Sequence, residues 1–189
     1  NPILKKFAKV MKKKKNSEER ITKIDTKDFY AASDSQKGMY LIDKMGDAGT
    51  AYNIPMLLEF NGALDRVRLE KTIDMLIERH EAFRTSFDLI DGEVVQKIHN
   101  SVSYIKEYAV VRQSEIDNIV HDCIQPFNLN MAPLFKVKLF KLDKEKHVLF
   151  FDVHHIVFDG GSVEVFLDDL ISLYKNENLK PIDIHYNDY

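Results

Sequence analysis

The sequence predicts an α/β fold in which a mixed β-sheet is flanked by helices. Three observations lead to this prediction. Segments with the period of two that is typical of strands alternate along the chain with segments of helical period. At Asp91-Gly92, turn residues separate two strand-like runs, which is typical of a β-hairpin. The 189 residues, of which 44% are hydrophobic and 30% are charged, suffice for one domain or lobe with a real core.

The N-terminal part is predicted to contain two helices with a linker between them. Apolar residues at helical spacing run through residues 3–15, and a polar stretch that reads as a linker follows over 16–25. The next helix is predicted over 33–44, because Ser33 or Asp34 offers a side-chain oxygen that caps a helix N-terminus.

The following elements are a strand, a long helix and a hairpin. Residues 54–60 are rich in apolar side chains and end at an Asn-Gly turn, so they predict a strand. Residues 64–80 carry apolar side chains on one helical face. The runs 83–90 and 94–99 flank Asp91-Gly92 and form the two strands of the hairpin.

The C-terminal half continues the alternation of strands and helices. The longest apolar run in it predicts a buried strand, and the last helix is amphipathic. The predicted order is a strand over 103–111, a helix over 115–125, strands over 134–142 and 147–153, and a helix over 163–174.

Composition excludes several classes of function and of location. The net charge of −3 argues against a nucleic-acid partner, and the basic run Lys12–Lys15 reads as a solvated helix end or linker. No apolar run approaches the roughly 20 residues of a membrane span, and no secretory signal is visible. The single cysteine, Cys123, cannot form an internal disulfide. A cytoplasmic location is therefore expected.

Two neighbouring histidines follow the predicted strand over 147–153. Side chains at such strand ends are aimed by a rigid element, and the loop beside them leaves room for a substrate. Because successive side chains of a strand point to opposite faces, only one of His154 and His155 is expected to face a given cleft. A metal site built from both rings is awkward, and the spacing indicates one working imidazole.

Four segments then carry a family resemblance: Ser33–Tyr40, Arg79–Phe87, His154–Gly160 and Tyr186–Tyr189. The third reads His-His-x-x-x-Asp-Gly. In this order the segments resemble the motifs of the condensation domains of nonribosomal peptide synthetases. They are also similar to the wider superfamily of coenzyme-A-dependent acyltransferases related to chloramphenicol acetyltransferase. The resemblance covers about residue 21 to the end of the sequence.

The chain departs mildly from the family motifs at four positions, where other residues are usual: Ser35, Gly38, Phe83 and Val153. Other positions bear on which subtype of the family the chain resembles. Heterocyclising relatives carry Asp in place of the first histidine, and epimerising relatives usually carry Trp soon after the Asp-Gly pair. This chain has His154 at the first of these positions and contains no tryptophan. The resemblance therefore implies bond formation between two carrier-bound residues.

The resemblance also implies a domain organisation. Family domains have two similar lobes, and residues 25–189 correspond to the N-terminal lobe, truncated inside the fourth motif. The reaction channel of the family lies between the lobes, so one wall of it is expected here. Residues 1–24 resemble the tail of an upstream peptidyl carrier domain. The alternative is a linker or docking helix.

By resemblance, His155 is the catalytic residue, and it is expected to accept a proton from the attacking amine or to hold that amine by a hydrogen bond. His154 is expected to be structural. Asp159 is expected to fix the loop by pairing with an arginine. Arg84 is the first candidate for this partner and Arg79 the second, and an arginine of the missing lobe is the third.

Two further site features concern the residues after Asp159. The backbone N–H of Gly160 or Gly161 is a candidate donor to the oxyanion, because a glycine allows close approach without a Cβ. Ser162 follows the two glycines and is expected to cap the next helix, since no base is spaced to make it a nucleophile.

The function implied is an amide-forming acyltransferase that condenses aminoacyl or peptidyl thioesters, as in peptide antibiotic biosynthesis. No cofactor is expected on this lobe, since substrates arrive on the 4′-phosphopantetheine of carrier domains. Its partners would be the upstream and downstream carriers and the missing lobe, and the isolated lobe is expected to be inactive. The alternatives are a coenzyme-A-dependent acyltransferase and a non-catalytic lobe that docks carriers.

Overall fold

The computed structural model describes residues 21–46 and 48–188. The chain divides into two compact units, one of residues 26–182 and one of residues 1–25 with 183–189. The predicted helix over 3–15 and the first half of the predicted linker, residues 16–20, lie outside the described residues. The domain boundary after residue 24 therefore stays a prediction.

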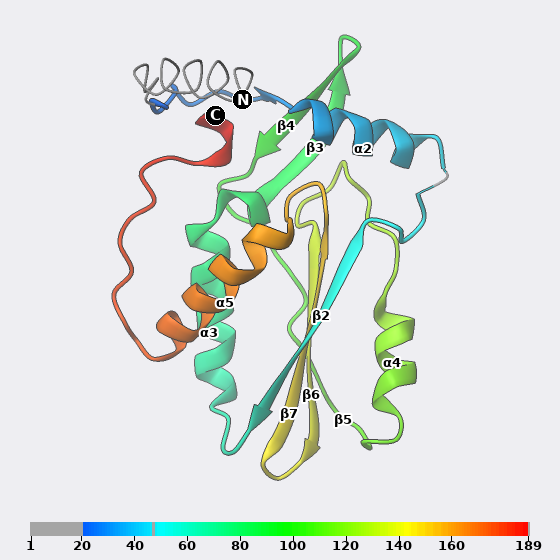
Figure 1. Cartoon of the computed structure of the whole chain (residues 1–189), viewed down its shortest axis with the longest axis vertical. Helices are drawn as coiled ribbons and strands as arrows, with labels where there is room; N and C mark the ends of the chain where they lie inside the picture. Colours follow the sequence, from blue (N-terminus) through cyan, green and yellow to red (C-terminus); the bar gives the residue numbers. More distant parts are fainter. Residues whose placement is uncertain (1–20, 47, 189) are drawn as a thin grey trace, which may run out of the picture. The chain divides into compact units, whose positions relative to one another are not determined.

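A four-stranded mixed sheet forms the centre of the larger unit, in the strand order β2-β7-β6-β5 (Figure 1). Its neighbouring strands are antiparallel except for β5 and β6, which are parallel. The prediction of a mixed sheet is therefore confirmed. The strands span Asn53–Asn61 (β2), Glu107–Val110 (β5), Phe135–Asp143 (β6) and Lys146–His154 (β7).

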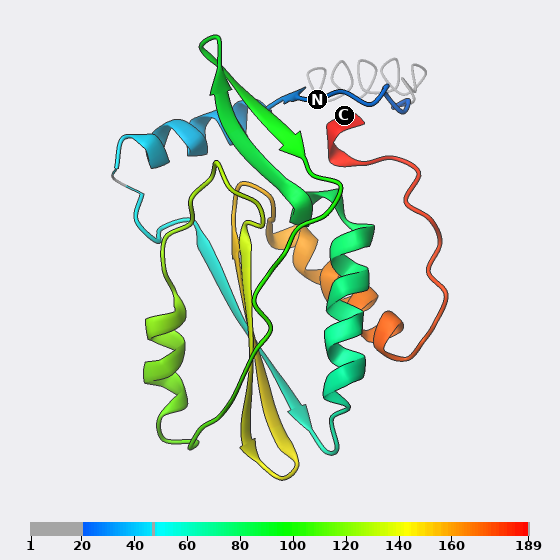
Figure 2. The ribbon, with the colours of Figure 1, turned by 180° about the vertical axis from the view of Figure 1, so that it is seen from behind.

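Helices cover both faces of this sheet, as seen from the two sides in Figures 1 and 2. Helices α3 (Arg66–Arg79) and α5 (Gly160–Tyr174) share one core with β6 and β7, and α4 (Ile116–Cys123) packs on the opposite face. Phe151 of β7 belongs to the first core and Phe150 to the second. Because β7 is covered on both faces, its sequence is almost continuously apolar.

The predicted hairpin exists, but it forms a separate antiparallel sheet rather than joining the mixed one. This sheet has the order β1-β4-β3, with β3 at Thr85–Ile90, β4 at Glu93–Ile98 and β1 at Tyr30–Ala31. The turn has positive φ angles of 51° at Asp91 and 82° at Gly92, as the Asp-Gly pair favours. The short strand β1 supplies the third strand of this second sheet and carries no recognisable pattern in the sequence.

Two short elements join these parts. Helix α2 (Asp34–Lys44) begins at the N-cap Ser33, whose side chain and that of Gln36 form a capping box. The 3₁₀ helix η1 (Glu81–Arg84) follows α3 and leads the chain into the second sheet. Within the described residues, no helix has the combination of length and apolar character that crossing a bilayer requires.

The smaller unit contains the segment with the fourth motif. A 3₁₀ helix, η2, spans Tyr186–Asp188. The Asp188 carboxylate accepts hydrogen bonds from the backbone N–H groups of Ile24, at 2.9 Å, and of His185, at 2.8 Å. The acidic residue of this motif therefore ties two distant parts of the chain together within this unit.

Candidate active site

The two histidines lie where β7 ends, and they have opposite environments. His154 is the last residue of the strand and only 3% exposed, whereas His155 begins the following turn and is exposed. The alternation expected from the sequence is confirmed, because one ring faces packing and the other faces solvent.

The His154 ring is held among polar and aromatic neighbours. Its Nδ1 accepts a hydrogen bond of 3.1 Å from the backbone N–H of Ile156, and its centroid lies 5.8 Å from that of Tyr52 and 5.9 Å from that of Phe127. Burial, with a smaller effect of the neighbouring His155, lowers the pKa of His154 to about 4. The ring is therefore neutral at pH 7, with its proton on Nε2, and serves to hold the turn.

The backbone at His155 is fixed although its ring is open to solvent. Its N–H donates to the carbonyl of Tyr52 at 2.8 Å, and its carbonyl accepts from the N–H of Phe158 at 3.4 Å. The exposed imidazole is thus carried by a turn that is bonded on both sides. A ring placed in this way can accept a proton or a hydrogen bond from a substrate without any rearrangement of the backbone.

Gln36 is a site residue that the sequence analysis did not single out. It is 4% exposed, and its Nε2 donates to the carbonyl of Ile156 at 3.1 Å. The first motif thereby anchors the histidine turn from α2, more than a hundred residues away in sequence. In the sequence, a glutamine three residues after the N-cap Ser33 predicts only a capping box. Gln36 makes that capping box through its Oε1, in addition to the bond to Ile156.

Within the described residues, Asp159 caps a helix and is not paired with an arginine. It is the N-cap of α5, and its Oδ1 accepts from the backbone N–H of Ser162 at 2.8 Å and from its hydroxyl at 2.7 Å. The Ser162 hydroxyl and backbone N–H lower the pKa of Asp159. Ser162 is accordingly the third residue of a capping box and not the cap itself, which corrects its predicted role.

In the described part of the chain, neither predicted arginine pairs with Asp159. The Nε of Arg84 donates to the carbonyl of Ile77 at 3.0 Å, and another guanidinium nitrogen donates to the carbonyl of His99. Arg84 thus closes the junction of α3, η1 and β4. The first helical turn of α5 satisfies Asp159 locally through its N–H groups, and the pair with an arginine of the second lobe stays a prediction.

Arg79 stabilises the packing of α3 on α5. Its Nε donates to Oδ2 of Asp169 at 2.8 Å, and a second nitrogen donates to the carbonyl of Lys180 at the same distance. The Nε2 of His80 lies 2.8 Å from the same carboxylate oxygen. The side chain of Asp169 is 12% exposed, so this cluster is a largely buried anchor of the second motif.

The two glycines occupy the first turn of α5. A Cβ at Gly160 would meet no atom within 4 Å, and a Cβ at Gly161 would lie at an ordinary contact distance of 3.5 Å from Oδ1 of Asp159. Both positions therefore have space around them, and the role of either N–H as an oxyanion donor stays a prediction.

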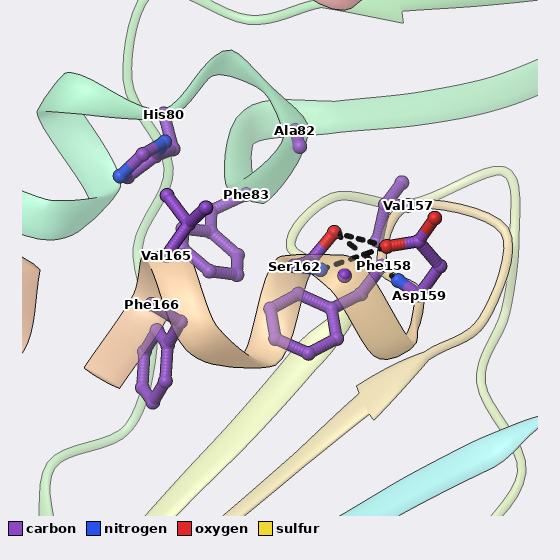
Figure 3. A pocket seen from close by; sticks show the side chains of 10 residues that line it. His80, Ala82, Phe83, Val157, Phe158, Asp159, Ser162, Val165 and Phe166 are labelled. Carbon is purple, nitrogen blue, oxygen red and sulfur yellow. Dashed lines mark hydrogen bonds between the residues drawn. The ribbon is translucent and has the colours of Figure 1, made fainter. Parts of the chain in front are cut away.

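A pocket of about 260 Å³ lies beside the histidine turn, between η1 and the start of α5 (Figure 3). Its walls are mostly apolar. The lining residues are His80, Ala82, Phe83, Val157, Phe158, Asp159, Gly161, Ser162, Val165 and Phe166. No group of three or more His, Cys, Asp or Glu side chains in the described residues is arranged to hold a metal ion.

Comparison with known families and proteins gives one consistent result. Residues 26–189 match the family model described as "Condensation domain". The chain is 39% identical over 192 aligned residues to surfactin synthase subunit 2 of Bacillus subtilis, and 40% identical over 169 to gramicidin S synthase 2 of Aneurinibacillus migulanus. These alignments cover 100% and 89% of the chain, but only 5% and 4% of those proteins.

Solved structures show the same fold. The X-domain in its complex with OxyB from teicoplanin biosynthesis aligns with a TM-score of 0.81 and 22% identity, over 90% of this chain and 39% of that one. The starter condensation domain of the rhizomide synthetase RzmA aligns with a TM-score of 0.74 and 20% identity, over 82% of this chain and 40% of that one. The matched extent is consistent with one lobe of a two-lobed fold.

Proposed function

The chain belongs to the condensation-domain family of nonribosomal peptide synthetases, and on that premise we propose that it forms the wall of an amide-forming site that carries the working imidazole, His155. One observation carries the proposal. His155 is exposed on the turn that follows a buried strand, and its backbone N–H is hydrogen-bonded to Tyr52. The carbonyl of the next residue, Ile156, accepts a hydrogen bond from Gln36. The neighbouring His154 is buried and hydrogen-bonded to the backbone of Ile156.

The chemistry is the attack of an amine on a thioester. The amine nitrogen forms a bond to the thioester carbon while the carbonyl oxygen becomes anionic and the nitrogen becomes cationic. His155, in its neutral form, accepts the proton from this nitrogen. The carbon–sulfur bond then breaks, and the same proton neutralises the departing thiolate. Base catalysis of this kind contributes typically about 10²–10⁴-fold in rate.

The substrates in this proposal are aminoacyl or peptidyl groups on the 4′-phosphopantetheine of two carrier domains. Holding both reactants in place contributes as much as the base or more, because it converts a bimolecular step into an intramolecular one. The partners are the two carriers and the second lobe of the domain, with residues 1–24 as the tail of an upstream carrier or as a linker. A lobe without its second wall is expected to be inactive, and the location is cytoplasmic.

The test compares single-turnover amide formation by the intact synthetase with donor and acceptor carriers loaded. We expect His155→Ala to lower the rate about 10²–10⁴-fold without lowering the unfolding temperature. His121→Ala is the matched control, because His121 lies on α4 with 88% of its side chain exposed. An unchanged rate in His155→Ala would remove this imidazole from the mechanism. Transfer from an acyl-coenzyme A to a free amine, without carriers, would assign the chain to the other acyltransferases of the superfamily.

A further inference from the structure

We propose that the pocket beside the histidine turn binds an aliphatic or aromatic side chain of the acyl group whose thioester carbon lies at His155. The inference rests on the proposed function and adds to it a substrate class, an apolar aminoacyl donor. It is built on the composition of the pocket, on the bonding of its polar groups and on its connection to His155.

The floor of the pocket consists of three phenylalanine rings from three different elements. The centroids of Phe83 and Phe158 lie 6.2 Å apart, those of Phe83 and Phe166 6.0 Å apart, and those of Phe158 and Phe166 6.0 Å apart. All three residues are at most 5% exposed, so they are anchored in the core of the larger unit. A floor of this kind presents a rigid apolar surface of defined shape.

The side chains at the mouth of the pocket are less bulky and more exposed than the phenylalanine rings of the floor. Ala82 of η1 and Val165 of α5 line it, and Val165 is 53% exposed (Figure 3). The small side chain of Ala82 leaves space at this rim. Entry from solvent is therefore open at a place where one additional large side chain would close it.

The polar groups at the rim are already bonded and leave the interior apolar. The Asp159 carboxylate accepts hydrogen bonds from the backbone and hydroxyl of Ser162, and the Nε2 of His80 is bonded to Asp169. Asp159 is an exposed carboxylate at the rim, and the phenylalanine-lined interior behind it carries no charged group among the described residues. An apolar substituent loses no hydrogen bond on entering and is the chemistry that this lining fits.

The pocket and the working imidazole share one short segment of backbone. Val157, Phe158 and Asp159 line the pocket and follow His155 by two to four residues. The backbone N–H of Phe158 donates to the carbonyl of His155 at 3.4 Å, so the two residues close one turn and their Cα atoms lie less than about 7 Å apart. An acyl group with its thioester carbon at His155 therefore lies beside the pocket, and we infer that its side chain enters it.

The volume favours a single side chain as the occupant. Pockets for drug-sized ligands span about 300–1,000 Å³, and this one measures about 260 Å³. Each buried methylene contributes about fourfold in binding, since it is worth about 0.8 kcal/mol. A leucyl group is thus expected to bind at least about tenfold more tightly than a glycyl group.

The first experiment measures single-turnover amide formation by the intact synthetase, with leucyl or glycyl donors loaded on the upstream carrier. We expect Ala82→Leu, which fills the mouth, to lower the rate with the leucyl donor about tenfold or more and to leave the glycyl rate within twofold. Ile171→Leu is the matched control, because Ile171 lies on the exposed side of α5 and does not line the pocket. Equal changes with both donors, or none, would overturn the proposal.

The second experiment separates the pocket from the chemistry. The probes are leucyl- and glycyl-pantetheine analogues in which an NH group replaces the thioester sulfur, so that an amide stands in place of the thioester. Their binding to the synthetase is measured by calorimetry, in the wild type and in Ala82→Leu. Tighter binding of the leucyl probe that Ala82→Leu abolishes would support the pocket even if His155→Ala left the condensation rate unchanged. A pocket filled by another part of the synthetase would show equal binding of the two probes, together with a lower unfolding temperature of Ala82→Leu, and would overturn the inference.

Discussion

The buried end of β7 and the open turn after it differ in how they treat the same type of side chain. In the buried region, His154 is 3% exposed and its pKa is lowered to about 4. In the turn, His155 is exposed, and among the described residues its hydrogen bonds are made by its backbone. The difference teaches that adjacent identical residues can have opposite surroundings, since one histidine is held inside the fold and the other is exposed to solvent.

The buried region also holds a second ionisable side chain. Asp152 is 0% exposed and points to the same face of β7 as His154, two residues further on. The Nδ2 of Asn53 donates to its Oδ2 at 2.7 Å, whereas its Oδ1 has no hydrogen-bond partner within the described residues. Burial raises the pKa of Asp152. This side of the strand therefore disfavours charge on both groups.

The largest expected effect separates the two histidines by stability. We expect His154→Ala to lower the free energy of unfolding by about 2–4 kcal/mol, because it leaves a cavity and an unpaired N–H at Ile156. His155→Ala is expected to change it by less than about 0.5 kcal/mol, since the ring is exposed. Urea unfolding of the wild type and the two variants measures both values. Equal losses would show that the two regions do not differ in this way.

The next prediction concerns the pH dependence that His154 imposes. The unfolded chain protonates this residue near pH 6.5 and the folded chain only near pH 4. Its contribution to stability is therefore present above pH 6.5 and is lost as the pH falls toward 4, by up to about 3 kcal/mol. The measurement is the difference in unfolding free energy between the wild type and His154→Gln at several pH values, in which other groups cancel. A difference that does not vary with pH would contradict the assigned burial.

A smaller effect tests the turn at its far end. We expect Asp159→Ala to lower the free energy of unfolding by about 1 kcal/mol, because it removes the N-cap of α5. Asp159→Ser is the control, since its hydroxyl can still accept from the first helical turn. A loss of about 3 kcal/mol or more in the intact synthetase would instead indicate a buried ion pair with an arginine. Thermal and urea unfolding distinguish the two results.

The smallest expected effect concerns Asp152. Because its pKa is raised in the folded chain, its favourable contribution is present at acidic pH and is lost as the pH rises through that raised pKa. Asp152→Asn removes this dependence and keeps an acceptor for Asn53. The variant is therefore expected to gain stability relative to the wild type as the pH rises from 4 to 7. If Asp152→Asn instead lost stability relative to the wild type over this pH range, Asp152 would be stabilised as an anion, for example by Lys136.

Local patterns in the sequence determined much of this protein. The apolar run over 147–153 predicted a buried strand, the Asp-Gly pair predicted the hairpin turn, and Ser33 was one of the two candidate caps of α2. The alternation of side chains along β7 indicated that only one of His154 and His155 would be open. Each of these features depends on residues close together in the sequence, where periodicity, turn chemistry and capping decide the conformation.

The tertiary structure decided the features that depend on distant residues. The hairpin paired with β1 in a second sheet, Gln36 reached the histidine turn, and Phe83, Phe158 and Phe166 met to form a pocket. Among the described residues, Asp159 is bonded to the first turn of α5. Spacing along a chain specifies which face a side chain takes, whereas the neighbour that it meets depends on how whole elements pack against each other.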